Sequence, residues 1–332
     1  MLPSDHVTIV VPTYNACHDL REAVLSLLAQ DYPSLDVLVV DNNCTDGTCE
    51  MLDDLARRDA RVRRVLETEQ SVTCARNRGC HEAQGNYVAF LDHDEIAPPH
   101  WLSTLMQCHR ETGAPGVGGP YQPLWEGTPS RWLARSTCMQ ETLSFMDFGR
   151  VRRPVDWLLG GNVLYTREAL ERVNYFGNWK SYTSGRCLVG GDDIVMGERM
   201  RRAGLQMHFE PAAVVSHKVP RRRQRLSYIL RRAFWSGYTD LAIGREWKFG
   251  AKGVRALKRG PDAIAVGMMI LPGTLYARLL VRLGYLHPLS PTDDDSAPCL
   301  YSVVDAEATA GQPQPAQEPS SDTELRRPRA IN

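Results

Sequence analysis

Residues 87–95 read Tyr-Val-Ala-Phe-Leu-Asp-His-Asp-Glu, an apolar run that ends in three carboxylates within four positions. The apolar part, Val88–Leu91, has the composition of a buried strand, so Asp92, Asp94 and Glu95 would follow its carboxyl end. Ligands bind at that end of the strands in open α/β sheets. Neighbouring carboxylates repel one another unless a cation lies between them, and oxygen ligands suit Mg²⁺ or Mn²⁺. The alternative is a solvated Asp-rich turn.

Strands and helices alternate along the chain on both sides of this stretch. The apolar runs His6–Val11 and Leu35–Val40 also end in polar loops, and segments with helical spacing separate the strands. This alternation is typical of a mostly parallel sheet with helices on both faces. The loops Thr13–Asn15, Asp41–Asp46 and Asp92–Glu95 would therefore meet at one edge of the sheet and line one crevice.

The common nucleotide-binding loops are missing from the chain. A dinucleotide-binding fold would carry GxGxxG after its first strand, where this sequence has Val-Pro-Thr-Tyr-Asn (11–15), and no GxxxxGK[ST] loop occurs. The composition is that of a globular protein, with 43% hydrophobic and 23% charged residues and a formal net charge of zero. Any nucleotide would therefore be held without a glycine-rich phosphate loop.

Four motifs taken together resemble the family 2 glycosyltransferases of GT-A fold. They are Val7–Asn15, Leu38–Thr48, Ala75–Gly79 and Phe90–Asp94, and the resemblance extends over roughly residues 7–217. It implies a nucleotide-diphosphate-sugar donor such as a UDP-sugar, one divalent ion (Mg²⁺ or Mn²⁺) and inversion at the anomeric carbon. The implied fold is a Rossmann-like, mostly parallel central sheet with helices on both faces.

The resemblance also implies roles for individual residues on the donor side. Pro12, Thr13, Tyr14 and Asp41 would line the nucleoside pocket, Arg76 would lie near the nucleotide, Asp92 would lie near ribose or metal, and Asp94 would ligate the metal. An Arg offers a forked, permanent positive charge to phosphate. The alternatives are a solvated helix residue for Arg76 and a turn residue that bonds its own backbone for Asp41.

A second acidic pair begins a predicted helix about a hundred residues later. Asp192 and Asp193 precede an apolar face and a stop at Gly204, so the helix N-terminus favours their ionised forms. In the family this helix begins Glu-Asp and the Asp is the general base, which here aligns with Asp193. The alternative is a helix cap and a first-turn acid. His217, at the end of the predicted strand 208–217, would either complete the metal site or be a surface residue.

The C-terminal third is strongly basic over residues 218–282, with fifteen Lys or Arg residues against three acids. Such a block binds phosphate in lipid headgroups or nucleic acid, but aromatic residues are not interleaved as stacking platforms, so we expect no nucleic acid. The apolar run Ala263–Leu275 is too short for a bilayer span. It predicts an interfacial helix pair, with packing onto the catalytic domain as the alternative.

These patterns predict a GT-A catalytic domain over residues 1–218, with a donor-binding half (about 1–97) and an acceptor half (about 98–218). A basic, partly apolar helical extension (219–288) and a disordered tail (289–332) would follow. Without a signal peptide, we expect the chain in the cytoplasm or peripherally on the inner face of the cell membrane. The acceptor would be a glycan or lipid-linked. The competing functions are a nucleotidyltransferase and a non-catalytic sugar- or nucleotide-binding protein on the same scaffold.

Overall fold

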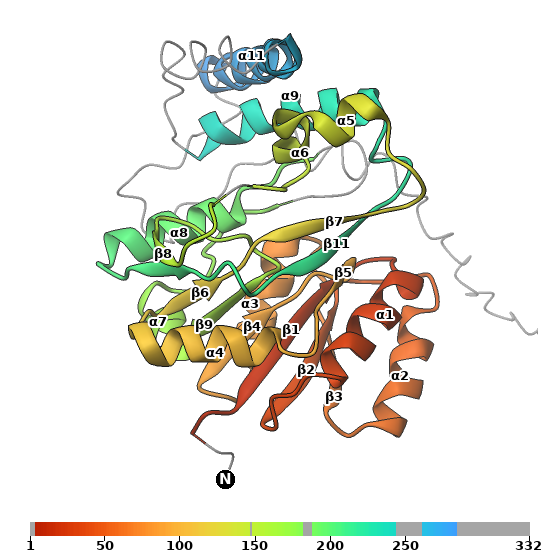
Figure 1. Ribbon diagram of the computed structural model, residues 1–332, viewed down its shortest axis with the longest axis vertical. Coiled ribbons are helices and arrows are strands. Elements are labelled where there is room, and N and C mark those ends of the chain that lie inside the picture. Colours follow the sequence, from red (N-terminus) through yellow and green to blue (C-terminus); the bar gives the residue numbers. More distant parts are fainter. Residues whose placement is uncertain (1–3, 147, 182–187, 244–260, 284–332) are drawn as a thin grey trace, which may run out of the picture.

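The computed structural model describes residues 4–146, 148–181, 188–243 and 261–283. Its larger sheet carries helices on both faces, and a helical layer lies over one end (Figure 1). The larger sheet has the strand order β3 (Val62–Leu66), β2 (Leu35–Asp41), β1 (Val7–Thr13), β4 (Tyr87–Phe90), β9 (Val163–Thr166), β6 (Gly116–Gly118), β10 (Met207–Phe209) and β8 (Arg153–Val155).

The N-terminal half of this sheet is parallel, and the remaining half is mixed. β1 pairs in parallel with both β2 and β4, and β2 with β3, so their carboxyl ends share one edge. β9 then runs antiparallel to both β4 and β6, and β8 antiparallel to β10. The predicted α/β class with a Rossmann-like sheet is therefore confirmed. The sheet is strictly parallel only over β3, β2, β1 and β4, which include the strands that precede the three polar loops.

Strand β1 continues through Pro12, where the sequence predicts that it stops. Val7 and Thr13 bond to the β2 side, and Val10 bonds to the β4 side through Leu91. The backbone groups of successive residues in a strand point to opposite neighbouring strands, so those of Pro12 point to the β4 side, as those of Val10 do. The pairing with β4 ends at Val10. The missing N–H of Pro12 therefore removes no ladder hydrogen bond.

Two hydrophobic cores lie on opposite faces of the larger sheet. One packs α1 (Cys17–Leu28), α2 (Thr48–Arg58) and α4 (Trp101–Thr112) against residues such as Ile9 and Val37. The other packs α3 (Val72–Glu82), α7 (Arg167–Arg172) and α8 (Asp192–Arg202) against residues such as Val10 and Phe90. The period-2 alternation of β1 thus supplies residues to both cores.

A second sheet of three strands crosses the carboxyl edge of the first (Figure 1). Its order is β5 (Glu95–Ile96), β11 (Val215–Val219) and β7 (Tyr121–Trp125). The single strand predicted over 208–217 is wrong: it is divided into β10 and β11, which belong to different sheets. The break follows Phe209, where the chain turns through a hydrogen bond from Ala213 N to Glu210 O. This division brings His217 beside Glu95 in the β5–β11 pairing.

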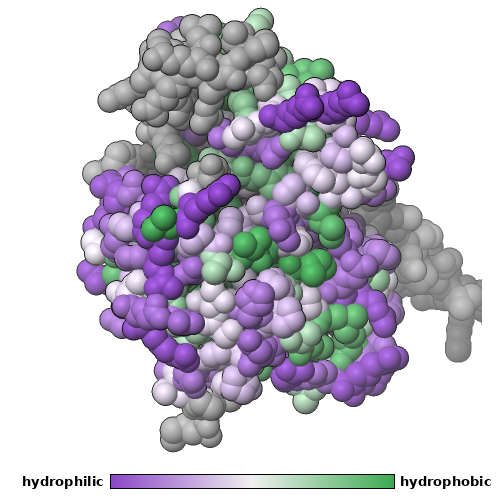
Figure 2. Space-filling model, in the orientation of Figure 1, coloured by the Kyte–Doolittle hydropathy of each residue, from purple (hydrophilic) through white to green (hydrophobic). Residues whose placement is uncertain are grey.

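The helical layer consists of α5 (Arg131–Arg135), α6 (Thr137–Thr142), α9 (Leu226–Ala242) and α11 (Pro261–Arg282). The helix pair predicted around 263–275 is wrong: Pro272 lies inside the single helix α11, which packs against α9. Among the residues described, no helix combines the length and apolarity needed to cross a bilayer. The predicted tail (289–332) lies outside the described residues. Figure 2 shows a mainly hydrophilic face with small, separate hydrophobic patches.

Candidate active site

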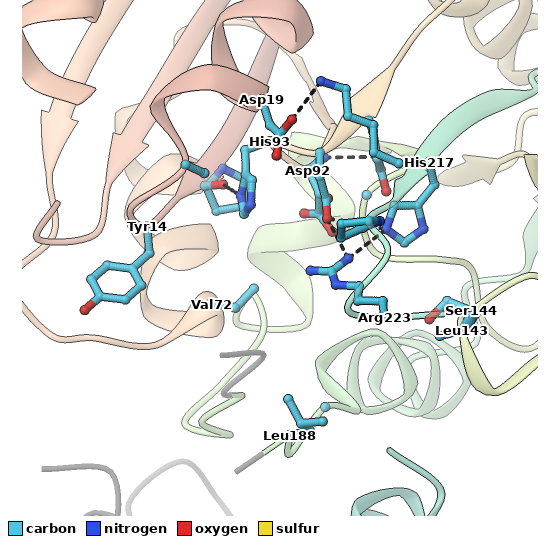
Figure 3. Close-up of a pocket in the computed structure, with 18 of the residues that line it drawn as sticks. Tyr14, Asp19, Val72, Asp92, His93, Leu143, Ser144, Leu188, His217 and Arg223 are labelled. Carbon is cyan, nitrogen blue, oxygen red and sulfur yellow. Dashed lines mark hydrogen bonds and ion pairs between the residues drawn. The ribbon is translucent and has the colours of Figure 1, made fainter. Parts of the chain in front are cut away.

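A cleft of about 1440 Å³ opens at the carboxyl edge of the parallel strands. All three polar loops contribute to its lining, as their common edge predicts, and so do β11, the start of α8 and the start of α9. Figure 3 shows Asp92, His93, His217 and Arg223 gathered in one part of the cleft, with Tyr14 and Leu188 apart from them. The cleft therefore joins segments from the predicted donor half, acceptor half and basic extension.

Asp94 and His217 lie together and share a cationic neighbour. Asp94 Oδ2 is 3.5 Å from His217 Nε2 and accepts a hydrogen bond of 2.7 Å from Arg223 Nη1. Burial acts to raise the pKa of Asp94, but the charges of Arg223 and His217 outweigh it and hold that pKa well below its usual value. The carboxylate is therefore ionised and is already paired with a guanidinium.

The chemistry of this pair fits a divalent ion that is also bound by a substrate. A carboxylate oxygen and an imidazole nitrogen both ligate Mn²⁺, and Mg²⁺ accepts the carboxylate. Nε2 of His217 is the nitrogen that faces Asp94, and its buried Nδ1 has no hydrogen-bond partner among the described residues. Within the described part of the chain, no three His, Cys, Asp or Glu residues converge as a metal site. The side chains of this pair that could hold such an ion are Asp94 and His217.

Arg76 connects the two acidic motifs that the sequence separates by a hundred residues. Its side chain is 4% exposed, Nη2 donates to Asp92 Oδ1 at 2.8 Å, and Nη1 donates to Asp192 Oδ2. Asp192 also accepts a hydrogen bond of 2.8 Å from Ser181 Oγ. The solvated helix residue considered as the alternative for Arg76 is excluded by this burial. The guanidinium is held by carboxylates of the chain itself.

Asp193 follows on the same helix and lies at the lining of the cleft, half-buried. Its Oδ1 accepts a hydrogen bond of 2.8 Å from Ile194 N in the first turn of α8. Burial and the neighbouring charge of Asp192 raise the pKa of Asp193 to about 7, against the opposing charges of Arg76 and Arg232. A carboxylate with this pKa accepts a proton from a hydroxyl more readily than an ordinary Asp does.

Glu95 is buried beneath the acidic loop, where the sequence gives it no role. It is 1% exposed, and its Oε2 accepts a hydrogen bond of 3.1 Å from Asp92 N. Burial and the charges of Asp92 and Asp94 raise the pKa of Glu95 well above its usual value. A Cβ atom at Gly161 would lie 2.6 Å from Glu95 Oε1, so the backbone at this glycine approaches the acid closely. Glu95 therefore stabilises the acidic loop by accepting the hydrogen bond from the backbone of Asp92.

The predicted nucleoside residues divide into two groups. Pro12, Thr13 and Tyr14 line the cleft, and the buried hydroxyl of Thr13 has no hydrogen-bond partner among the described residues. Asp41 is not among the lining residues described: its carboxylate accepts from Cys44 N at 2.8 Å and from Arg64 Nη1 at 3.2 Å. The structure thus shows Asp41 bonding its own loop, which was the alternative considered for it.

Four arginines of the predicted basic extension line the cleft. Arg222, Arg225, Arg231 and Arg232 surround the start of α9, and none of them forms an ion pair with a carboxylate in the described parts of the chain. The basic run itself was the available signal, but it does not tell which arginines face the cleft. An unpaired cationic wall of this kind favours phosphate groups.

Comparison with known proteins agrees with this geometry. Residues 8–173 match the model of the family described as "Glycosyl transferase family 2". The succinoglycan biosynthesis protein ExoM of Rhizobium meliloti is 30% identical over 238 residues, which cover 70% of this chain and 74% of that protein. This chain belongs to glycosyltransferase family 2. The predicted family is therefore confirmed, and the chain is a glycosyltransferase.

More distant relatives share most of the length of this glycosyltransferase. The glucosyl-dolichyl phosphate glucuronosyltransferase of Haloferax volcanii is 23% identical, over 70% of this chain and 75% of that protein. The solved mannosyltransferase PcManGT of Pyrobaculum calidifontis, in complex with GDP-Man and Mn²⁺, matches with a TM-score of 0.54 and 22% identity. That match covers 85% of this chain and 81% of the other, and it shows a shared GT-A fold.

Proposed function

We propose that this glycosyltransferase moves a sugar from a nucleotide-diphosphate-sugar, a UDP-sugar, to an acceptor hydroxyl, with inversion and with the help of a divalent metal. The observation that carries the proposal is that one cleft is lined by two acidic residues in different environments, Asp94 and Asp193. Asp94 is ionised beside His217, whereas Asp193 has a pKa raised to about 7. Two carboxyl groups tuned in opposite directions suit two different roles in one reaction.

Asp193 would take the proton of the acceptor hydroxyl as that oxygen attacks the anomeric carbon. Its carboxyl group is half-buried and fixed at the first turn of α8, where burial and the charge of Asp192 raise its proton affinity. Asp94 and His217 would hold Mg²⁺ or Mn²⁺, whose positive charge stabilises the departing nucleoside diphosphate. Pro12, Thr13 and Tyr14 would contact the nucleoside, with the unpartnered hydroxyl of Thr13 available to it.

The acceptor would be a glycan or a lipid-linked sugar. The unpaired arginines at the start of α9 support a phosphate-bearing substrate, and the name of the Haloferax relative includes a dolichyl phosphate. The donor and metal of the mannosyltransferase PcManGT, GDP-Man and Mn²⁺, support a nucleotide-sugar and a divalent ion as a class. We infer that the enzyme works in the cytoplasm, peripherally on the inner face of the membrane through residues 219–286.

Two substitutions test the assignment of the acidic centres. Asp193→Asn should leave donor binding nearly unchanged and lower transfer by about 10²- to 10⁴-fold, because it removes a general base. Asp94→Ala should weaken metal-dependent donor binding, measured by calorimetry with Mn²⁺. The exposed Asp31 is not part of the cleft lining, so Asp31→Asn serves as the control. Full transfer by Asp193→Asn would exclude this residue as the base.

Analysis of the nucleotide product separates the proposal from a nucleotidyltransferase. Release of the nucleoside diphosphate, with a new glycosidic bond of inverted configuration, is the expected result. Release of pyrophosphate would identify the competing reaction. Donor binding with no turnover under any acceptor would identify a binding protein on the same scaffold.

A further inference from the structure

Arg76 lines the cleft, and both terminal nitrogens of its guanidinium are held by carboxylates of the chain itself. Its guanidinium donates to Asp92 on the donor side and to Asp192 on the acceptor side, and it is 4% exposed. Gly160 lies close to the guanidinium, because a Cβ atom at this position would be 2.7 Å from Arg76 Nη1. The ring of Phe176 lies against the guanidinium, 5.9 Å from its carbon to the ring centroid. The two terminal nitrogens of Arg76 are thus directed at two carboxylates.

Each of these carboxylates belongs to a different functional motif. Asp92 begins the loop that contains Asp94, and Asp192 is the residue immediately before Asp193. Asp192, the first residue of α8, also accepts a hydrogen bond from Ser181, so Ser181 and Arg76 together hold its side chain. A buried Arg between two carboxylates fixes both in orientation and balances their charge.

We propose that Arg76 is a positioning residue that joins the donor loop to the helix of the general base and sets the charge around Asp193. The inference rests on the proposed role of Asp193 as the base. It differs from a direct contact between Arg76 and the nucleotide, which the family resemblance implies.

The charged and titratable groups that face Asp193 give the direction of the effect. Asp192 acts to raise the proton affinity of Asp193, whereas Arg76 and Arg232 act to lower it. Tyr165 faces the same region from β9, and its own pKa is raised by burial and by the charge of Asp193, so it stays neutral. Loss of the Arg76 charge therefore makes Asp193 harder to ionise, and loss of the Asp192 charge makes it easier.

The test is the pH dependence of transfer by the full chain. Arg76→Gln should raise the pH at which kcat/KM reaches half of its plateau, and Arg76→Lys, which keeps the charge, should reverse most of that shift. Asp192→Asn should lower the midpoint pH. Arg78 lies on the same helix, is exposed and pairs with Glu82, so Arg78→Gln should keep the midpoint of the parent protein.

Donor binding distinguishes positioning from a nucleotide contact. A positioning role predicts a change in donor Kd of about threefold or less for Arg76→Gln. A lost charged hydrogen bond to phosphate would weaken donor binding about tenfold or more. Weakening on that scale with an unmoved midpoint would overturn the inference in favour of a nucleotide contact. A drop in kcat at every pH, again with an unmoved midpoint, would leave only a structural role and would also overturn it.

Two controls keep the test decisive. If circular dichroism shows that Arg76→Gln does not fold, Asp192→Asn decides, because it removes one buried charge and keeps the side-chain volume. A midpoint that does not fall in Asp192→Asn overturns the inference. Asp193→Asn separates the two proposals: full transfer would overturn the base and this inference together, whereas lost transfer with unmoved midpoints in the other variants would overturn the role of Arg76 alone.

Discussion

Arg223 decides how the carboxylate of Asp94 is paired before a substrate enters. Its Nη1 atom lies 2.7 Å from Asp94 Oδ2 and 3.4 Å from His217 Nε2, so one cationic group contacts both proposed metal ligands. A divalent ion held by the same two atoms would have to replace this guanidinium. The pair with Arg223 thus keeps Asp94 ionised, but it also competes with a metal for the same oxygen.

Substitution of Arg223 should therefore strengthen the binding of metal alone. We expect Arg223→Gln to bind Mn²⁺ about tenfold or more tightly in the absence of donor, because a charged hydrogen bond no longer has to be broken. Calorimetric titration with Mn²⁺ measures this directly. Arg222, which is exposed in the same cleft and makes no contact with Asp94, gives the matched control Arg222→Gln. Unchanged or weaker Mn²⁺ binding by Arg223→Gln would contradict the competition.

Among single residues, the acidic side chains of the site can be predicted from the sequence more readily than the side chains that contact them. Asp94 and Asp193 each stand out because they directly follow a strand or begin a helix, which a local pattern records. The partner Arg223 does not stand out, because it is one of several arginines in a basic run and its contact with Asp94 joins residues 129 positions apart. The resemblance includes Arg76 in a motif, but its bond to Asp192 joins residues 116 positions apart. No local pattern contains such a contact.

At the scale of elements, the crossing of α9 and α11 depends on two glycines. A Cβ atom at Gly237 would lie 2.1 Å from Ile270 O, and one at Gly273 would lie 1.8 Å from Phe234 O. Both neighbours are backbone atoms, which cannot move without separating the helices. Thr274 adds a hydrogen bond of 3.2 Å to Gly237 O at the same crossing. The two helices therefore pack backbone to backbone.

Gly237→Ala should consequently lower the free energy of unfolding, although Ala is the better helix former. The propensity gain is about 1 kcal/mol, whereas overpacking against backbone costs about 1–3 kcal/mol, so we expect a net loss of up to about 2 kcal/mol. Chemical denaturation measures the difference. The neighbouring exposed residue gives the control Ser236→Ala, which should change stability little. A more stable Gly237→Ala protein would show that α11 does not pack on α9 in this way.

The elements that the sequence predicts best are those with complete periodic patterns. β2 ends within one residue of the predicted range Leu35–Val40, because its apolar run is followed directly by polar residues. The errors lie where an apolar pattern continues across a turn. Residues 208–217 read as one strand because the break at Glu210–Ala213 contains apolar residues and is specified by hydrogen bonds to distant segments, such as Glu210 N to Gly118 O.

At the scale of the whole molecule, the cleft and the helical layer lie beside each other. α9 contributes Arg231 and Arg232 to the cleft on one side and packs against α11 on the other. On α11, Met268, Leu275 and Leu279 are 68%, 52% and 51% exposed, and their spacing of seven and four residues puts them along one face. The face combines exposed apolar residues with the exposed Arg278 and Arg282. This combination suits an anionic lipid surface.

If α11 lies on such a surface, its exposed leucines should determine membrane binding. We expect the double substitution Leu275→Glu and Leu279→Glu to weaken binding to vesicles rich in phosphatidylglycerol by tenfold or more, since burial of each leucine contributes about 1.5–3 kcal/mol. Co-sedimentation at low and high salt measures the affinity and its electrostatic part. Leu66, 50% exposed on the edge strand β3, gives the control Leu66→Glu, which should bind as the parent does. Equal binding by the α11 double variant and the Leu66→Glu protein would exclude α11 as the contact, and strong binding to neutral vesicles at high salt would exclude an electrostatic role for Arg278 and Arg282.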